Sequence, residues 1–193
     1  MKSGPLPFLI PLALRVSQFI DRSHQILGRC TAWLCIVMIA VGSWNVVGRY
    51  VGRALGENLT SNVLIETQWY LFDLIFLLGG AYALQCNDFV RVDLLYSHFN
   101  TRQKAIANLV GTLLFQIPFC IFILIYSWQF VSFSWATWEV SPDPDGLPVY
   151  PIKTMILVGF TTMLLQGISE VLKNLLILTG HLTPQDNSYG SEL

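Results

Sequence analysis

Residues 31–50 read TAWLCIVMIAVGSWNVVGRY, and the first charged side chain in this run is Arg49. A helix of about 20 mainly apolar residues is long enough to cross the hydrocarbon core of a bilayer. The run is too long for a strand, and it lacks the two-residue alternation of a half-buried strand. It therefore predicts a membrane-spanning helix.

The composition of the whole chain agrees with a membrane protein. Of its 193 residues, 53% are apolar and 12% are charged, whereas soluble domains are about 45–50% apolar and about 25% charged. The formal net charge of −1 indicates no nucleic-acid partner. None of the four cysteines forms a CxxC pair or a metal-binding spacing with histidine, so we interpret them as small buried hydrophobic residues. The lipid bilayer is the first expected partner.

Three more stretches have the length and composition of membrane-spanning helices. The second span covers about residues 63–84, the third starts near residue 106 and meets no charge until Glu139, and the fourth covers about residues 152–176. We therefore expect an all-α integral membrane protein with four transmembrane helices.

The basic residues predict how the chain is oriented. Four Lys or Arg residues precede the first span, three lie between the second and third spans, and one follows near the end of the fourth. That places eight of the eleven on the side of the two termini, which the positive-inside rule assigns to the cytoplasm. Residues 1–29 are then a cytoplasmic N-terminal segment, 30–178 the membrane domain, and 179–193 a polar cytoplasmic tail that we expect to be disordered.

The N-terminal segment has an amphipathic pattern. Its apolar residues recur at helical spacing, and its arginines lie elsewhere: Leu12, Val16, Phe19, Ile20 and Leu27 against Arg15, Arg22 and Arg29. This pattern predicts an interfacial helix over about residues 12–28 that lies along the membrane. Three prolines, the last of them Pro11, are expected to prevent an earlier helix start.

The second span contains two acids, Glu66 and Asp73. Asp73 lies near the middle, where a charge costs at least about 2.5–3.5 kcal/mol. Glu66 is two turns earlier on the same face, which Trp69 continues, so the two acids lie about 10 Å apart. Two interpretations stay open: an ion- or proton-coupling site, or an acid kept protonated or hydrogen-bonded to a group such as Asn45.

Small residues follow the first span. Gly48, Gly52 and Gly56 are four residues apart, with Arg49 and Arg53 between them, and this spacing lets helices approach closely. The stretch is either a helix that continues against a partner or a loop loosened by glycine.

The third span ends in aromatic residues and leads into a proline-rich connection. Pro118 predicts a kink in this span. Trp128, Trp135 and Trp138 share a face, which indicates an aromatic belt at the membrane interface or a docking surface for an external partner. Residues 139–153, EVSPDPDGLPVYPIK, include Glu139 and Lys153 and predict a stiff loop into the fourth span.

No catalytic motif is present. None of the three histidines lies within a predicted span, which disfavours a haem-binding membrane anchor, and the chain has no nucleotide-binding or hydrolase motif. We therefore expect no enzyme activity, no cofactor and no metal.

Four stretches resemble a known family. They are ETQWYLFDLIFLLGGAYAL (66–84), DFVRVDLL (88–95), SWATWEVSPDPDGLPVYPIK (134–153) and LLQGISE (164–170). An acid before an aromatic span, followed by an H-V-R-V-D-like pentad, resembles the small membrane subunit of tripartite ATP-independent periplasmic (TRAP) transporters, the DctQ-like family. The resemblance covers roughly residues 30–178. It departs at the pentad, where Asp88 and Phe89 replace the usual histidine while VRVD is kept.

The resemblance implies a four-helix protein of the bacterial inner membrane with two protein partners. One is a large, many-spanning permease subunit that carries substrate and sodium, and the other is a soluble periplasmic substrate-binding protein. The small subunit would brace the large one without itself binding the substrate, an organic acid such as a 2-oxo acid or lactate. The candidate partner contacts are Gly48, Arg49, Gly52, Arg53, Glu66, Trp69, Asp73, Arg91, Asp93, Trp138, Glu139, Lys153 and Glu170.

Arg91 and Asp93 come directly after the second span. We expect Arg91 to contact a lipid phosphate or a partner carboxylate. Asp93 would cap the next helix or pair with a nearby basic residue. The simpler alternative is a charged stop after the span.

Two other functions compete with the transporter subunit. The first is an independent, homodimeric four-helix transporter that couples protons or sodium through Asp73. The second is the membrane anchor of an oxidoreductase, which the positions of the histidines disfavour.

Overall fold

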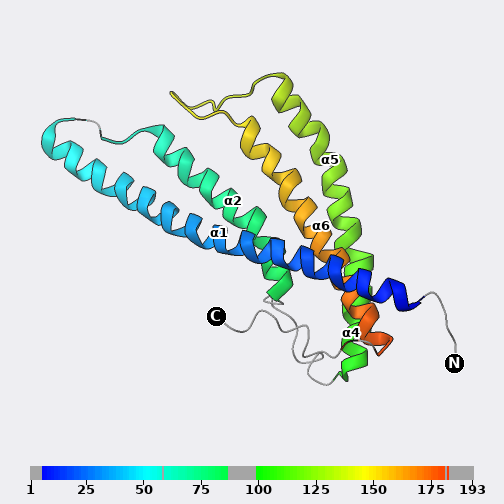
Figure 1. The fold of residues 1–193 in the computed structure, drawn as a ribbon. Helices are drawn as coiled ribbons and strands as arrows, with labels where there is room; N and C mark the ends of the chain where they lie inside the picture. Colours follow the sequence, from blue (N-terminus) through cyan, green and yellow to red (C-terminus); the bar gives the residue numbers. More distant parts are fainter. Residues whose placement is uncertain (1–5, 58, 87–98, 181, 183–193) are drawn as a thin grey trace.

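The computed structural model describes residues 6–57, 59–86, 99–180 and 182. In this part of the chain the elements are helices: α1 (Leu6–Leu55), α2 (Asn62–Cys86), α4 (Thr101–Gly111), the π-helical turn η1 (Thr112–Gln116), α5 (Ile117–Ala136) and α6 (Tyr150–Leu178). The continuous run α4–η1–α5 and the helices α1, α2 and α6 are each long and apolar enough to cross a membrane. The predicted all-α fold with four spans is confirmed (Figure 1).

The first helix differs from the sequence prediction. Residues 12–28 form no separate interfacial helix, because they are the first half of one 50-residue helix, α1. The prediction that Pro11 delays the start of the helix is also wrong, since α1 begins at Leu6. Pro7 occupies the second helical residue, where no N–H is needed, and Pro11 removes only one hydrogen bond near the N-terminus.

α1 is much longer than a bilayer is thick, and its two halves pack on different helices. Fifty residues extend about 75 Å, against a hydrocarbon core of about 30 Å. The first half crosses α6, and the remainder runs antiparallel to α2 (Figure 1). Where α1 passes α2, a Cβ on Gly28 would lie 2.6 Å from the ring of Tyr82, so only glycine permits this approach.

α6 is the central helix, because it contacts α1, α2, α4, η1 and α5. Its buried residues are mostly small or polar, and they include Gly159, Gln166 and Ser169. Large apolar side chains such as Phe115 and Phe133 face outward. In a soluble protein the large apolar side chains would be buried instead. The opposite arrangement is expected where lipid surrounds the helices and small residues let the helix backbones approach each other.

Where the sequence predicted a kink at Pro118, the structure has a π-helical turn, η1, immediately before α5. Pro118 is the second residue of α5, directly after η1. The wider π turn, in which the Ile117 N–H donates to the Thr112 carbonyl, accommodates a residue that has no N–H and whose ring would clash in a regular helix. The Gln116 amide donates to the Met163 carbonyl at 3.2 Å, which fastens this turn to α6.

Candidate functional site

The connection between α5 and α6 folds into a short hairpin, residues 139–149. Val140 and Pro148 form an isolated antiparallel bridge. The Val149 N–H donates to the Glu139 carbonyl at 2.9 Å, and the Ser141 N–H donates to the Leu147 carbonyl at 3.1 Å. The connection predicted over residues 139–153 is shorter than expected, because α6 already begins at Tyr150. The hairpin lies at the same end of the molecule as the α1–α2 connection (Figure 1). We call this end the loop end.

Glu66 joins the hairpin to α2. Its side chain is buried, with 3% of the residue exposed. One carboxylate oxygen accepts the Leu147 N–H at 2.5 Å, and the other accepts the Ser141 hydroxyl. Asn62 and Tyr70, also on α2, donate to the carbonyls of Pro144 and Pro148 at 3.2 and 3.0 Å. Glu66 thus has an internal, structural role, because it holds the hairpin against α2.

An ion pair and an aromatic group close the other side of the hairpin. Lys153 on α6 contacts Glu139 at 2.5 Å, and its ammonium lies 4.1 Å from the ring centre of Phe130. The hydrogen bond from Lys153 holds the pKa of Glu139 below its ordinary value. Trp138 packs edge-on against Tyr150 yet is 65% exposed, with a left-handed φ of 48°. This places an exposed tryptophan at the loop end.

Asp73 has a different environment from Glu66. It is exposed at the middle of α2, and no hydrogen bond or ion pair joins it to another residue that the structure describes. Its surroundings on α2 are aromatic and outward-facing, since Trp69 is 60% and Phe76 is 70% exposed. The hydrogen bond to Asn45, which was one of the open alternatives, is not formed: Asn45 is buried, and its amide oxygen has no partner in the described part of the chain.

Polar side chains also join α1 to α6 at the end opposite the hairpin. Asp21 contacts the Lys173 ammonium at 2.8 Å and accepts hydrogen bonds from Ser169 at 3.1 Å and Gln166 at 3.2 Å. Lys173 also contacts Glu170 at 3.2 Å. We call this group, with Ser17 bound to Ser169 at 2.8 Å, the α1–α6 polar cluster: Ser17, Asp21, Gln166, Ser169, Glu170 and Lys173.

Sequence reasoning missed the α1–α6 polar cluster, although the spacing of its α6 residues is visible in the sequence. Gln166, Ser169, Glu170 and Lys173 recur at spacings of three, four and seven residues, which puts them on one face of a helix. A polar stripe in a span needs partners on another helix. The partner, Asp21, lies about 150 residues away in the sequence, and its pairing has no local signature.

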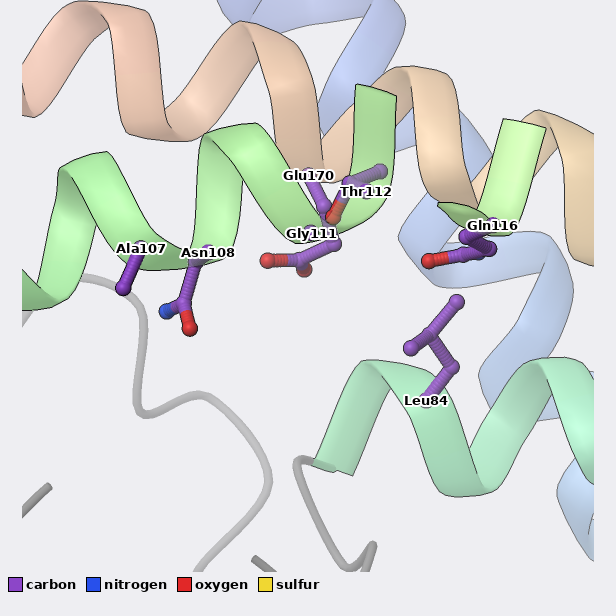
Figure 2. A pocket seen from close by; sticks show the side chains of 7 residues that line it. All are labelled: Leu84, Ala107, Asn108, Gly111, Thr112, Gln116 and Glu170. Carbon is purple, nitrogen blue, oxygen red and sulfur yellow. The ribbon is translucent and has the colours of Figure 1, made fainter. Parts of the chain in front are cut away.

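A small cavity lies beside this cluster (Figure 2). It has a volume of about 210 Å³ and lies where the end of α2, the α4–η1 segment and α6 meet. Its lining is mixed, with four polar residues: Leu84, Ala107, Asn108, Gly111, Thr112, Gln116 and Glu170. Because Glu170 already contacts Lys173, the cavity offers no unpaired charge.

The candidate glycines and the candidate arginines have different environments in the structure. Gly48 and Gly52 are buried, and they face the connection that follows α1 in the same chain. A Cβ on Gly52 would lie 2.5 Å from the carbonyl oxygen of Glu57. Arg49 and Arg53 are exposed on the same helix. α1 continues to Leu55, so the continuing helix is found, and the glycines pack against this chain's own backbone.

Comparison with known protein families identifies the chain. One family model, described as the DctQ component of tripartite ATP-independent periplasmic transporters, matches residues 30–176. The chain belongs to the DctQ family. No curated protein and no solved structure matches it.

As a DctQ-family member, the chain is the small permease subunit of a TRAP transporter and a multi-pass membrane protein. The family is a transporter component and not an enzyme. The hairpin contacts, Asp73 and the α6 half of the polar cluster all lie inside the matched residues, whereas Asp21 lies before them. Arg91 and Asp93 lie outside the described residues, so their anchoring role stays a prediction.

Proposed function

We propose that this DctQ-family chain braces the large permease subunit of a TRAP transporter during sodium-coupled uptake of an organic acid. The periplasmic binding protein would deliver that acid, and the complex would lie in a bacterial inner membrane with both termini of this chain in the cytoplasm. The observation that carries the proposal is the exposure of Asp73 at the middle of α2.

An exposed acid at this depth cannot be left facing lipid without cost. A charge at the bilayer centre costs at least about 2.5–3.5 kcal/mol, and polar groups there face a protein interior or partner. Trp69 and Phe76 beside Asp73 are exposed as well. A partner that covers this face of α2 and offers Asp73 a hydrogen-bond donor removes both costs.

The partner on this face is a different protein and not a second copy. α2 contains no Lys or Arg, so two copies meeting through this face would place Asp73 against Asp73 without a cation. Like charges at such a contact are unfavourable. A large subunit that carries a donor fits better than the homodimer of the competing hypothesis.

The rest of the chain supports a bracing role. Glu66 holds the hairpin against α2, and the α1–α6 polar cluster holds α1 against α6. Polar contacts therefore join the helices at both ends of the molecule. The exposed Trp138 and the Glu139–Lys153 pair are proposed to meet the binding protein at the loop end. The organic-acid substrate follows from the family resemblance and not from any contact in this chain.

The test compares two properties of Asp73→Leu. Removing the exposed acid is expected to leave the isolated subunit as stable as before or more stable, because a mid-membrane acid is removed. It is expected to weaken the complex with the large subunit by about thirtyfold or more, since a buried partner group is left unpaired. Thermal unfolding measures the first property, and co-purification at graded expression measures the second.

Asp143→Asn serves as the control, because Asp143 is also an exposed acid but lies in the hairpin. It should change neither property. An Asp73→Leu complex that assembles as fully as the parent would remove Asp73 from the interface and leave the bracing role without its main support.

A further inference from the structure

The first half of α1 has two parallel rows of side chains on the face away from α6. The rows contain exposed apolar residues (Leu12, Phe19, Ile26 and Trp33) and exposed arginines (Arg15, Arg22 and Arg29). Each row repeats every seven residues, which is nearly two helical turns, so each runs almost straight along the helix at intervals of about 10 Å.

The opposite face of α1 is turned toward the other helices. Ser17, Ile20 and His24 are buried there. Asp21, the sole acid in α1, points to that side and contacts Lys173. The outward face therefore carries three positive charges and no negative one, and none of its arginines forms an ion pair with a residue that the structure describes.

α6 indicates the depth at which these rows lie. Lys153 and Lys173 are 20 residues apart on α6, which is about 30 Å along the axis and matches the thickness of the hydrocarbon core. Lys153 contacts Glu139 at one edge, and Lys173 contacts Asp21 and Glu170 at the other. Asp21, and with it Arg22, therefore lies level with one edge of the apolar core.

The length of α1 requires it to tilt through the membrane. Gly48 contacts the α1–α2 connection at the loop end, and from Asp21 to Gly48 the helix extends about 40 Å. To fit a core of about 30 Å, α1 must lie obliquely. Its first half then leaves the core gradually. Because side chains on a helix lean toward its N-terminus, the arginines reach toward the head-group region while the apolar row stays in acyl chains.

We propose that this face of α1 binds the phosphate groups of anionic phospholipids through Arg15, Arg22 and Arg29. A guanidinium binds phosphate through two parallel hydrogen bonds, and a basic row beside an apolar row is the pattern of an interfacial helix on an anionic membrane. The charge distribution of the chain assigns these lipids to the cytoplasmic leaflet.

A helix of a partner protein could also pack against side chains that repeat every seven residues, but the depth of this face in the membrane favours lipid. Arg22 lies at the edge of the core, where phosphates are present, and the apolar row continues into the membrane as Trp33. The rows thus face lipid along their whole length, from head groups to acyl chains.

The test counts the lipids that the full chain retains. The protein is purified from mixed micelles with equal phosphatidylglycerol and phosphatidylcholine, and native mass spectrometry measures the bound ratio. The triple variant R15Q/R22Q/R29Q should lower association with phosphatidylglycerol about a hundredfold, since each basic side chain contributes about fivefold at an anionic surface. R15K/R22K/R29K keeps the charge and should keep most of the preference.

The control is R49Q/R53Q, which removes two exposed arginines from the other end of the same helix and should keep the preference for phosphatidylglycerol. Raising the salt from 0.15 M to 1 M shortens the screening length from about 8 Å to about 3 Å and should weaken the parent's preference. If the triple variant fails to fold by circular dichroism, the single variant R22Q is measured instead, with an expected loss of about fivefold.

Two results would overturn the proposal. In the first, the glutamine variants retain phosphatidylglycerol as fully as the parent. In the second, lipid binding is unchanged while co-purification with the large subunit is lost, which would assign this face to an acidic protein helix.

Discussion

Replacing Lys173 with Met should release the first half of α1 from α6. Lys173 is the cation between two acids, 2.8 Å from Asp21 and 3.2 Å from Glu170, and the side chains of Lys173 and Asp21 are 10% and 20% exposed. Methionine keeps the length of the side chain but leaves two nearly buried carboxylates without a cation. Breaking a buried ion pair in this way costs about 3–5 kcal/mol.

We expect a value near the lower limit, about 3 kcal/mol, because Asp21 keeps its hydrogen bonds from Ser169 and Gln166. The loss is local, since the second half of α1 packs on α2 and does not depend on this contact. Hydrogen exchange of amides in residues 10–30 should therefore accelerate about a hundredfold in K173M, while the rest of α1 and α2 keep their protection.

K153M provides the matched comparison, because it removes the other lysine of α6 from an ion pair at the opposite end. It should loosen the hairpin and leave residues 10–30 unchanged. The double variant D21N/K173M should lose less than the sum of the single variants, as expected for groups in contact. Unchanged exchange in K173M, or equal acceleration in K153M, would refute the role assigned to the α1–α6 polar cluster.

Two further predictions concern the hairpin and the packing of α2 on α6. Because the folded pKa of Glu139 lies below its ordinary value of 4.5, the Glu139–Lys153 pair stabilises the hairpin above that pH and loses this contribution as the pH falls through the folded pKa. Proteolysis of the hairpin between pH 6 and pH 3 should show the loss, and E139Q should reduce the dependence. G159A should destabilise the fold by about 1–3 kcal/mol, since a Cβ there would lie 2.9 Å from the Leu77 carbonyl oxygen. In G79A the added Cβ would have no neighbouring atom within 4 Å, so this variant should be neutral or stabilising in thermal unfolding.

The spans could be predicted because their signal is local. A run such as residues 31–50 carries its own hydrophobic length, and no knowledge of other helices is needed to recognise it. The proline-rich connection was also recognised from a local signal, since its prolines restrict the backbone directly, although its predicted end was too late because α6 begins at Tyr150. The four predicted spans hold in the structure.

The predictions that were wrong or missed depended on tertiary contacts or on residues that are distant in the sequence. The start of α1 was placed too late because Pro11 was treated as a helix breaker, although a proline near the N-terminus of a long helix costs little. Glu66 was recognised as unusual, but its partner is the backbone N–H of Leu147, and any residue type except proline supplies such a group. Asp21 was passed over because its meaning depends on Lys173.

The two acids of α2 also differ in contacts that the local sequence does not show. Sequence alone put Glu66 and Asp73 on one face but did not show what either side chain contacts. The hairpin covers Glu66 and stops short of Asp73, which divides them into an internal connection and an exposed group. That division comes from the fold of residues 139–149, whose contact with α2 has no signature in the sequence of α2 itself.

The central claim is that this chain works as one part of a larger complex. It is tested most directly by co-expressing the chain with a large TRAP permease subunit from the same genome, purifying through a tag on this chain, and measuring the mass of the purified assembly. The account predicts a single complex that contains both subunits. A homodimer of this chain that carries sodium or protons across liposomes without the large subunit would contradict it.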